Sequence, residues 1–202
     1  MPFESPLHLL LIVALIAYLM GSIPFGLVIA RLFNLGDLRK IGSGNIGATN
    51  VLRSGSKSAA LATVLLDAGK GLLPVVLARA YVGDDAAQIA ALSSFLGHLY
   101  PVWLRFRGGK GVATFLGTLF GLAPLIGLIA VGGWIATFLV FRISSASALV
   151  STAVTTALAY LIGFSDLTPL MLIMAVLLFW KHRENIQRLL SGEEAKSALL
   201  RK

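Results

Sequence analysis

Long apolar runs recur from one end of this chain to the other, and they leave no stretch for a separate water-soluble domain. A helix of about 20 apolar residues crosses the hydrocarbon core of a bilayer, which is about 30 Å thick. The mean hydropathy is +0.87 and only 13% of the residues are charged, values outside the usual range of soluble domains. We therefore predict an all-α, multi-pass integral membrane protein that forms a single domain over residues 1–202.

The apolar runs and the turn signals between them predict about seven membrane-spanning helices. The expected spans lie near Leu7–Phe33, Ala59–Tyr81, Ala86–Trp103, Val112–Leu122, Pro124–Phe141, Ala146–Phe164 and Leu167–Trp180. The first run is longer than the apolar core of a signal peptide, so we expect it to be retained. The fourth and seventh spans are short, and we expect Lys181–Leu190 to continue the last helix as far as Ser191-Gly192.

The distribution of charge decides whether residues 112–141 form one helix or two. With a break before Pro124, nearly all lysines and arginines lie on one side of the membrane, and Asp84, Asp85 and Asp166 lie on the other. A single helix would move Arg142 and the basic C-terminal tail to the outside. The positive-inside tendency therefore predicts an outer N-terminus and a cytoplasmic C-terminus.

The net charge of +8 is explained by cytoplasmic loops beside anionic lipid headgroups, so nucleic acid is not an expected partner. The chain has no cysteine, which excludes disulfides, thiolate nucleophiles and cysteine-ligated metal centres. We expect no metal and no cofactor. No internal repeat of the kind found in inverted-repeat transporters is evident.

The first of three polar clusters on the predicted cytoplasmic side begins at Gly42 and ends at Arg53. Its glycines let backbone N–H groups approach an anion, and its hydroxyl and amide side chains add donors. The predicted ligand-binding residues are Gly42, Gly44, Asn45, Thr49, Asn50 and Arg53, with Ser43 as a catalytic candidate. The string fits the spacing of a dinucleotide fingerprint, but that motif follows a strand, and here a membrane helix precedes it. A flexible membrane loop is the alternative interpretation.

The second cluster surrounds Lys110. Glycines flank this lysine, and the following helix presents N–H groups that favour negative charge. The predicted binding residues are His98, Gly108, Gly109, Gly111 and Thr114, with Lys110 as a catalytic candidate. The sequence lacks a Walker A motif, so ATP hydrolysis does not follow. Arg105 and Arg107 are better explained as positive-inside charge, and His98 is either a ligand or a cap partner.

The third cluster contains His182 and Asn185, which are three residues apart and share a helical face. A histidine side chain ordinarily titrates near neutrality, so His182 could accept a hydroxyl proton, or it could bind lipid headgroups at the interface. Inside the second predicted span, Asp67 and Lys70 also share a face. Ionisable side chains in a membrane usually form pairs facing the protein interior. We predict a buried pair in which Asp67 supports the site and Lys70 contacts substrate; a purely structural pair is an equal alternative.

The three clusters together resemble the three cytoplasmic motifs of the PlsY family, the bacterial acyl-phosphate:glycerol-3-phosphate acyltransferases. The resemblance rests on Ser43-Gly44-Asn45, Ala48-Thr49-Asn50 and Arg53; on Gly97-His98, Pro101, Phe106 and Gly108–Thr114; and on His182 with Asn185. The match covers nearly the whole chain in the same order. It implies seven membrane helices and a site on the cytoplasmic face of the bacterial inner membrane.

The implied reaction moves an acyl group from acyl phosphate to the 1-hydroxyl of glycerol 3-phosphate, giving lysophosphatidate and phosphate. This is the first acylation of phospholipid synthesis. Two phosphates need two anion sites, which agrees with the two glycine-rich clusters. The expected roles place the acyl phosphate at the glycine loops and Lys110, and glycerol 3-phosphate at Arg53, Lys70, His182 and Asn185, although the two could be exchanged. Either His182 or a substrate phosphate could accept the proton.

A transporter or channel for a phosphorylated metabolite is the main alternative function. Its binding residues would be expected along several spans near the membrane midplane, whereas most polar residues here lie at the cytoplasmic ends. Asp67 and Lys70 are the exception. A purely structural membrane subunit would not explain the glycine-rich donor loops. Ser43 as an acylated nucleophile is disfavoured because no activating base stands at a suitable spacing.

Overall fold

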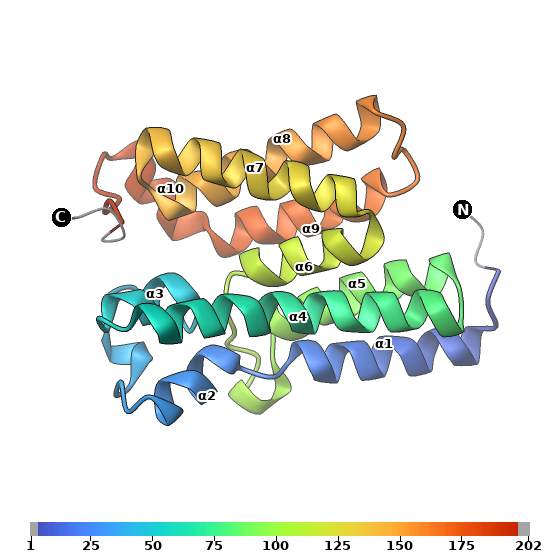
Figure 1. Cartoon of the computed structure of the whole chain (residues 1–202), viewed down its shortest axis with the longest axis horizontal. Helices are drawn as coiled ribbons and strands as arrows, with labels where there is room; N and C mark the ends of the chain where they lie inside the picture. The colour runs from blue at the N-terminus through green and yellow to red at the C-terminus, as the bar shows by residue number, and fades with distance from the viewer. Residues whose placement is uncertain (1–3, 198–202) are drawn as a thin grey trace. The chain divides into compact units, whose positions relative to one another are not determined.

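Helices make up all the regular structure of residues 4–197, which are the residues that the computed structural model describes (Figure 1). The α-helices are α1 (Leu7–Gly21), α2 (Phe25–Leu32), α3 (Ala48–Arg53), α4 (Lys57–Tyr81), α5 (Asp84–Leu99), α6 (Val112–Leu122), α7 (Pro124–Phe141), α8 (Ser144–Leu161), α9 (Thr168–Lys181) and α10 (Arg183–Leu190), and the 3-10 helices are η1 (Leu38–Lys40) and η2 (Val102–Leu104). The all-α prediction is confirmed.

The helices group into two compact units, one ending at Ala123 and the other beginning at Pro124. The break falls where the sequence predicted two helices rather than one, because Ala123 has an extended backbone before Pro124. At this break the Arg79 side chain donates hydrogen bonds to the carbonyl oxygens of Gly121 and Leu122, so the last turn of α6 keeps its partners. The prediction of a single domain remains untested.

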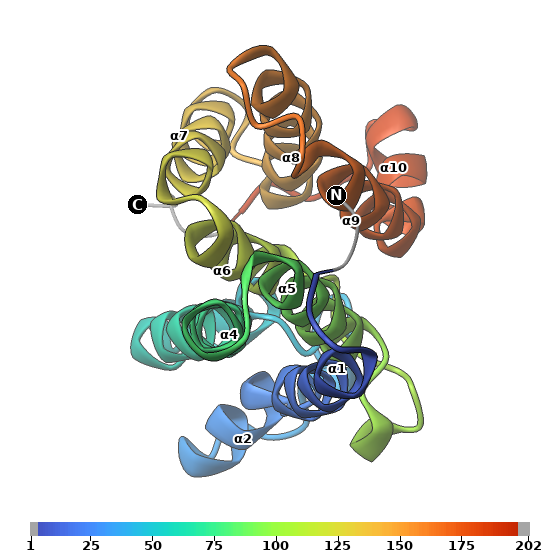
Figure 2. The ribbon, with the colours of Figure 1, turned by 90° about the vertical axis from the view of Figure 1, so that its right-hand side faces the viewer.

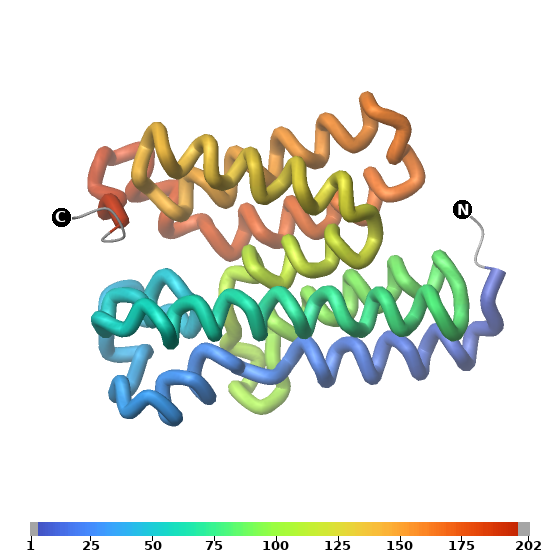
Figure 3. The backbone as a smooth tube through the Cα atoms, in the orientation of Figure 1, coloured from blue at the N-terminus to red at the C-terminus, as the bar shows by residue number. Residues whose placement is uncertain are grey.

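The expected first span, Leu7–Phe33, is not one continuous helix. Helix α1 ends at Gly21 and α2 begins at Phe25, and the smooth tube in Figure 3 shows the chain leaving its helical path between them. Pro24 lacks a backbone N–H and cannot continue the hydrogen-bond ladder of a helix. The carbonyl of Ile23 accepts the N–H of Phe25 at 3.0 Å and the Lys70 ammonium at 2.7 Å.

Small residues let the helices of the first unit approach closely. A Cβ atom at Gly21 would lie 2.0 Å from the carbonyl oxygen of Ser94, and one at Gly97 would lie 2.3 Å from that of Tyr18, so α1 and α5 pack backbone to backbone. Gly117 brings α6 against Ala68 of α4 in the same way. Close contact through small residues is the usual basis of helix packing in membranes. Figure 2 views α1, α4, α5 and α6 along their axes.

In the second unit, α8 packs against α7 and α9. The hydroxyl of Ser151 donates to the carbonyl oxygen of Ala130, which joins α8 to α7. The expected continuation of the last span through Lys181–Leu190 is interrupted, because His182 leaves helical geometry with a ψ of 7° and separates α9 from α10. Helix α10 then ends as predicted, and Gly192 has a φ of 74°, which favours glycine at a helix C-terminus.

Four helical stretches within residues 4–197 are long and apolar enough to cross a membrane: Leu7–Leu32, Lys57–Tyr81, Pro124–Phe141 and Ser144–Leu161. Two predicted short spans are apolar helices below that length, Val112–Leu122 and Thr168–Lys181. The span predicted at Ala86–Trp103 corresponds to α5, which ends at Leu99 just before Pro101. The number of crossings and the orientation of the termini therefore remain predictions.

Candidate functional site

The first cluster folds around the buried side chain of Asn50. Its Nδ2 donates to the carbonyl oxygens of Leu38 and Asn45, both at 2.8 Å, and its Oδ1 accepts from the N–H of Ser43 at 3.3 Å. Asn50 is 2% exposed, so these contacts occupy an amide that water cannot reach. The predicted ligand-binding residue Asn50 is thus placed inside the loop, where it fixes the backbone around Ser43.

Arg53 lies across the glycine at the start of this loop. A Cβ atom at Gly42 would come within 2.7 Å of the Cδ and Nη1 atoms of Arg53 and of the Asn50 Oδ1, and Gly42 has a φ of 54°. Only glycine fits both the left-handed backbone and the space under the guanidinium. The loop and Arg53 therefore form one structural unit, with Arg53 and Ser43 both exposed at its surface.

The remaining predicted residues of the first cluster shape the same turn. Gly44 has a φ of 67° and donates its N–H to the carbonyl of Ile41 at 2.9 Å. The Oδ1 of Asn45 accepts from the N–H of Gly47 at 3.1 Å, and Thr49 is exposed in the first turn of α3. The structure thus brings the predicted residues from Gly42 to Arg53 together in one loop and short helix.

The second cluster packs against the end of α5. The N–H of Gly109 donates to the carbonyl of His98 at 3.1 Å, and a Cβ atom at Gly109 would lie 2.1 Å from the His98 Nε2. A Cβ atom at Gly108 would similarly lie 2.1 Å from the carbonyl oxygen of His98. His98 therefore packs against Gly108 and Gly109 and accepts a hydrogen bond from the loop. Of the two roles considered from the sequence, this contact resembles that of a cap partner more than that of a ligand.

Lys110 is half-buried and precedes the N-terminus of α6. Gly111 caps this helix in a left-handed conformation, with a φ of 85°, and its carbonyl accepts the N–H of Phe115. A helix N-terminus beside a lysine attracts an anion through its free N–H groups. The last predicted residue of the cluster, Thr114, is fully buried, and its backbone and methyl group lie against Gly71 of α4.

Asp67 and Lys70 form the predicted buried ion pair. The Lys70 Nζ lies 2.7 Å from the Asp67 Oδ1, both side chains are 4% exposed, and Lys70 also donates to the Ile23 carbonyl. The His98 Nδ1 lies 3.7 Å from the same Asp67 oxygen. The Lys70 ammonium already contacts two oxygen atoms of the protein, which agrees with a supporting role for the pair. The contact of Lys70 with substrate stays a prediction.

The third cluster lies in the second unit, where His182 and Asn185 are 2% and 5% exposed. The His182 Nδ1 lies 2.8 Å from the carbonyl oxygen of Leu178. A carbonyl can only accept, so in the neutral ring Nδ1 carries the proton and Nε2 is the basic nitrogen. This tautomer leaves His182 able to accept a proton at Nε2.

Sequence reasoning missed the acidic partner of this cluster. The carboxylate of Glu194 accepts hydrogen bonds from Asn185, from Ser145 at 2.7 Å and from Arg188 at 2.6 Å. Partial burial raises the pKa of Glu194, but the hydrogen bonds from Ser145, Asn185 and Arg188 outweigh it and bring that pKa below its ordinary value. Glu194 is one of two adjacent glutamates in a polar tail, and the sequence does not single it out because only the folded tail brings it beside Asn185.

Among residues 4–197, no group of three or more histidine, aspartate and glutamate side chains is arranged to hold a metal ion.

A comparison with known proteins agrees with the arrangement of these clusters. The family model described as glycerol-3-phosphate acyltransferase matches residues 11–192, which include all three clusters. A protein of that name from Cereibacter sphaeroides is 59% identical over 193 residues, covering 96% of this chain and 92% of the relative. The chain belongs to the glycerol-3-phosphate acyltransferase family. A relative of the same name from Agrobacterium fabrum is 51% identical over 188 residues, covering 93% and 92% of the two chains.

Two solved acyltransferase structures share this fold. Both are crystal structures of PlsY, described as an integral membrane glycerol 3-phosphate acyltransferase, one in its glycerol 3-phosphate form and the other in its lysophosphatidic acid form. The first has a TM-score of 0.89 at 39% identity and covers 95% of this chain and 96% of its own. The second has a TM-score of 0.85 at 37% identity and covers 93% and 94%. The predictions from the sequence that the chain belongs to this family and lies in a membrane are confirmed.

Proposed function

We propose that this glycerol-3-phosphate acyltransferase takes its acyl group from an acyl phosphate and transfers it to the 1-hydroxyl of glycerol 3-phosphate. The products are lysophosphatidate and inorganic phosphate, and the reaction is the first acylation of phospholipid synthesis. Two solved relatives are described as glycerol 3-phosphate and lysophosphatidic acid forms, which supports this acceptor and this product. The proposed location is the bacterial inner membrane, with the reacting groups at its cytoplasmic face.

The observation that carries the proposal is the position of Arg53 over the loop that begins at Gly42. Arg53 is exposed, and its guanidinium can bind two phosphate oxygens in a bidentate manner. Asn50 fixes the backbone N–H of Ser43 from inside the loop, and the Ser43 side chain is exposed at the same loop. A rigid site of this kind suits the phosphate of glycerol 3-phosphate.

The acyl phosphate is assigned to Lys110 and the N-terminus of α6. Lys110 supplies a positive charge, and the first N–H groups of the helix supply donors for the phosphate that leaves. The apolar surfaces of neighbouring helices can hold the acyl chain in lipid. An acyl phosphate is a mixed anhydride with a good leaving group, so positioning and charge stabilisation can supply much of the acceleration.

His182 and Asn185 in the second unit are assigned to the acceptor hydroxyl. His182 presents a basic Nε2 when its Nδ1–H donates to Leu178, and Asn185 is fixed by Glu194. In the reaction, the oxygen of the 1-hydroxyl forms a bond to the acyl carbon and the bond from that carbon to the phosphate oxygen breaks. The hydroxyl proton passes to His182 or to the departing phosphate, and no covalent enzyme intermediate is required.

The donor is tested with purified protein in detergent, palmitoyl phosphate and labelled glycerol 3-phosphate. We expect equal amounts of phosphate and labelled lysophosphatidate, and no product when palmitoyl-CoA replaces the acyl phosphate. Product formation from the CoA donor at a similar rate would contradict the proposed donor. Saturable uptake of glycerol 3-phosphate into proteoliposomes without any lipid product would contradict the reaction itself and favour transport.

The site assignments are tested with single variants. Lys110→Ala should lower turnover with saturating substrates, and Arg53→Lys should raise the KM for glycerol 3-phosphate because lysine cannot reproduce the bidentate contact. His182→Gln with near-normal turnover would remove the histidine from proton transfer and leave the substrate phosphate as the acceptor. Arg183→Gln, an exposed neighbour, serves as the matched control.

A further inference from the structure

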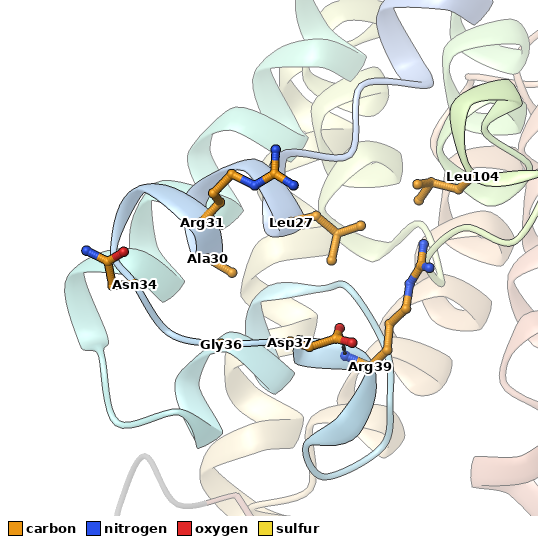
Figure 4. Close-up of a pocket in the computed structure, with 8 residues that line it drawn as sticks. All are labelled: Leu27, Ala30, Arg31, Asn34, Gly36, Asp37, Arg39 and Leu104. Atoms are coloured by element: carbon orange, nitrogen blue, oxygen red, sulfur yellow. Dashed lines mark hydrogen bonds between the residues drawn. The ribbon is translucent and has the colours of Figure 1, made fainter.

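A cavity of about 600 Å³ lies in the first unit beside the loop at Gly42–Arg53, and none of its lining residues is assigned to the reaction (Figure 4). Its walls come from α2, from the segment leading into η1 and from η2. The apolar wall contains Leu27, Ala30 and Leu104, and the polar wall contains Arg31, Asp37 and Arg39. Neither the family motifs nor the predicted site includes any of these residues.

The polar wall favours an anion. Arg31 and Arg39 are both exposed, and within residues 4–197 their guanidinium groups make no hydrogen bond or ion pair with the protein. The carboxylate of Asp37 is already used, because its Oδ1 accepts the backbone N–H of Arg39 at 3.0 Å and caps η1. Two guanidinium groups against one carboxylate leave a net positive wall, and guanidinium geometry matches phosphate oxygens.

The side chains around the cavity are of the kind expected at the level of the lipid headgroups. Arg31 is one residue from the end of the apolar stretch Leu7–Leu32. Exposed apolar side chains flank the cavity on both sides, with Leu32 69% exposed next to Arg31 and Trp103 61% exposed next to Leu104. Tryptophan and arginine at the end of an apolar helix are typical of the membrane–water interface.

We propose that this cavity binds the phosphate headgroup of a lipid, with Arg31 and Arg39 on the phosphate oxygens and Leu27 and Leu104 on the first carbons of the acyl chain. Figure 4 shows Leu27 between the two arginines and the Arg39 side chain extending toward Leu104. Two sources offer this chemistry: an anionic phospholipid of the bilayer and a lipid phosphate that takes part in the reaction. The ligand is a lipid in either case, because free phosphate would leave the apolar wall unused.

A bound lipid would act on the loop at Gly42–Arg53 through η1, which carries the lining residue Arg39. The carbonyl of Leu38, in η1, accepts the Asn50 Nδ2 at 2.8 Å, and a Cβ atom at Gly44 would lie 3.2 Å from the Arg39 carbonyl oxygen. The segment that carries Arg39 therefore also anchors the glycine loop. Filling the cavity should restrain η1 and raise the order of this loop.

Binding is measured without any reaction, using the fluorescence of Trp103. A variant with Trp134→Phe and Trp180→Phe keeps this tryptophan alone. In neutral detergent, brominated phosphatidylglycerol should quench it saturably, and brominated phosphatidylcholine should quench it only at higher concentration. Arg31→Gln with Arg39→Gln should weaken phosphatidylglycerol binding by about tenfold, since two charge-assisted contacts are lost. Lys40→Gln with Lys57→Gln removes two exposed charges outside the cavity. This variant should bind phosphatidylglycerol with an affinity within about twofold of the parent.

Competition then distinguishes the two sources. Displacement of the brominated lipid by lysophosphatidate or palmitoyl phosphate at much lower concentration than by unlabelled phosphatidylglycerol would assign the cavity to the lipids of the reaction. Displacement by unlabelled phosphatidylglycerol at the same concentration as by lysophosphatidate would assign the cavity to a phospholipid of the bilayer. Equal quenching by the two brominated lipids, or unchanged binding in the Arg31/Arg39 variant with its melting temperature retained, would overturn the proposal. Arg31→Lys with Arg39→Lys, which keeps both charges, should retain the preference in weaker form. Phosphatidylglycerol binding and its loss in the Arg31/Arg39 variant are measured without turnover, so these two results do not depend on the acyl donor.

Discussion

The Lys70 ammonium donates to the carbonyl oxygen of Ile23, 2.7 Å away, at the point where Pro24 interrupts the first apolar helix. The same ammonium pairs with Asp67 on its own helix. The buried charge pair thus adds a second donor to a carbonyl at the helix break, which also accepts the N–H of Phe25 at 3.0 Å. In a membrane, such a carbonyl must find a partner inside the protein.

Removing one member of this pair should destabilise the protein strongly. Lys70→Met removes the ion-pair partner of Asp67 and one of the two donors to the Ile23 carbonyl, and breaking a buried pair costs about 3–5 kcal/mol. Lys70→Met with Asp67→Leu removes both charges and should recover part of this loss. Thermal unfolding in detergent measures both variants.

The double variant also separates a structural role from a role in binding. Recovered stability with normal turnover would mean that Lys70 does not contact substrate, whereas recovered stability without turnover would support the contact predicted from the sequence. Equal melting temperatures for the single and double variants would contradict the energetic coupling of Asp67 and Lys70.

Asn50 should be more sensitive to an isosteric change than Asn45. Asn50→Asp replaces a donor to two carbonyls by an acceptor, so the contacts to Leu38 and Asn45 become repulsive. Leaving buried carbonyls unpaired costs about 1–3 kcal/mol. Asn45→Asp keeps its acceptor for Gly47 and serves as the control. Chemical denaturation of both variants should show the loss only for Asn50→Asp, and equal losses would contradict the anchoring role.

Gly42→Ala should impair substrate binding as well as the backbone. The new Cβ would lie 2.7 Å from Arg53 and Asn50 atoms, so the guanidinium must move. Gly55→Ala provides the control, because Gly55 also has a positive φ, 94°, but nothing lies within 4 Å of its Cβ position. Both variants should lose about 1–2 kcal/mol from backbone strain. Only Gly42→Ala should raise the KM for glycerol 3-phosphate, and equal KM values would argue against Arg53 as a phosphate ligand.

The sequence was sufficient to predict the helices that depend on apolar length and proline. The break before Pro124 and the ends of the helix from Val112 to Leu122 were placed correctly, because proline and the surrounding turn residues act locally. The break between Gly21 and Phe25 was missed although Ser22 and Pro24 mark it locally, because the length of the apolar run favoured one continuous span. Its stability depends on Lys70, which lies far along the chain, and such a contact leaves no local signal.

The candidate site was predictable to a similar extent. Glycine spacing identified the two loops of the first unit, where Gly42 and Gly109 leave room for the side chains of Arg53 and His98. Sequence could not show that Asn50 faces inward or that His98 lies under Gly109, because either side chain could have pointed toward a ligand. The cavity beside Arg31 and Arg39 was missed because positive-inside charge explained both arginines.

Glu194 should make the attachment of the C-terminal tail sensitive to acid. Hydrogen bonds from Ser145, Asn185 and Arg188 keep its pKa below the ordinary value despite partial burial. A carboxyl group with a lowered pKa in the folded state contributes stability above its unfolded pKa of about 4.3 and loses it as the pH falls through the folded value. The tail should therefore remain attached from neutral pH to about pH 5 and loosen below about pH 4.

Hydrogen exchange of the segment after Leu190, corrected for the intrinsic rate at each pH, measures this attachment. The N–H groups of Glu194 and Ser197 donate to the carbonyls of Arg188 and Arg142, so their protection reports whether the tail is bound. Glu194→Gln should lose protection already at pH 7 and show no further acid step. Glu193→Gln should behave as the parent, because Glu193 is exposed. If Glu194→Gln keeps full protection at pH 7, the tail is held by its backbone contacts and the carboxylate is not what fixes Asn185.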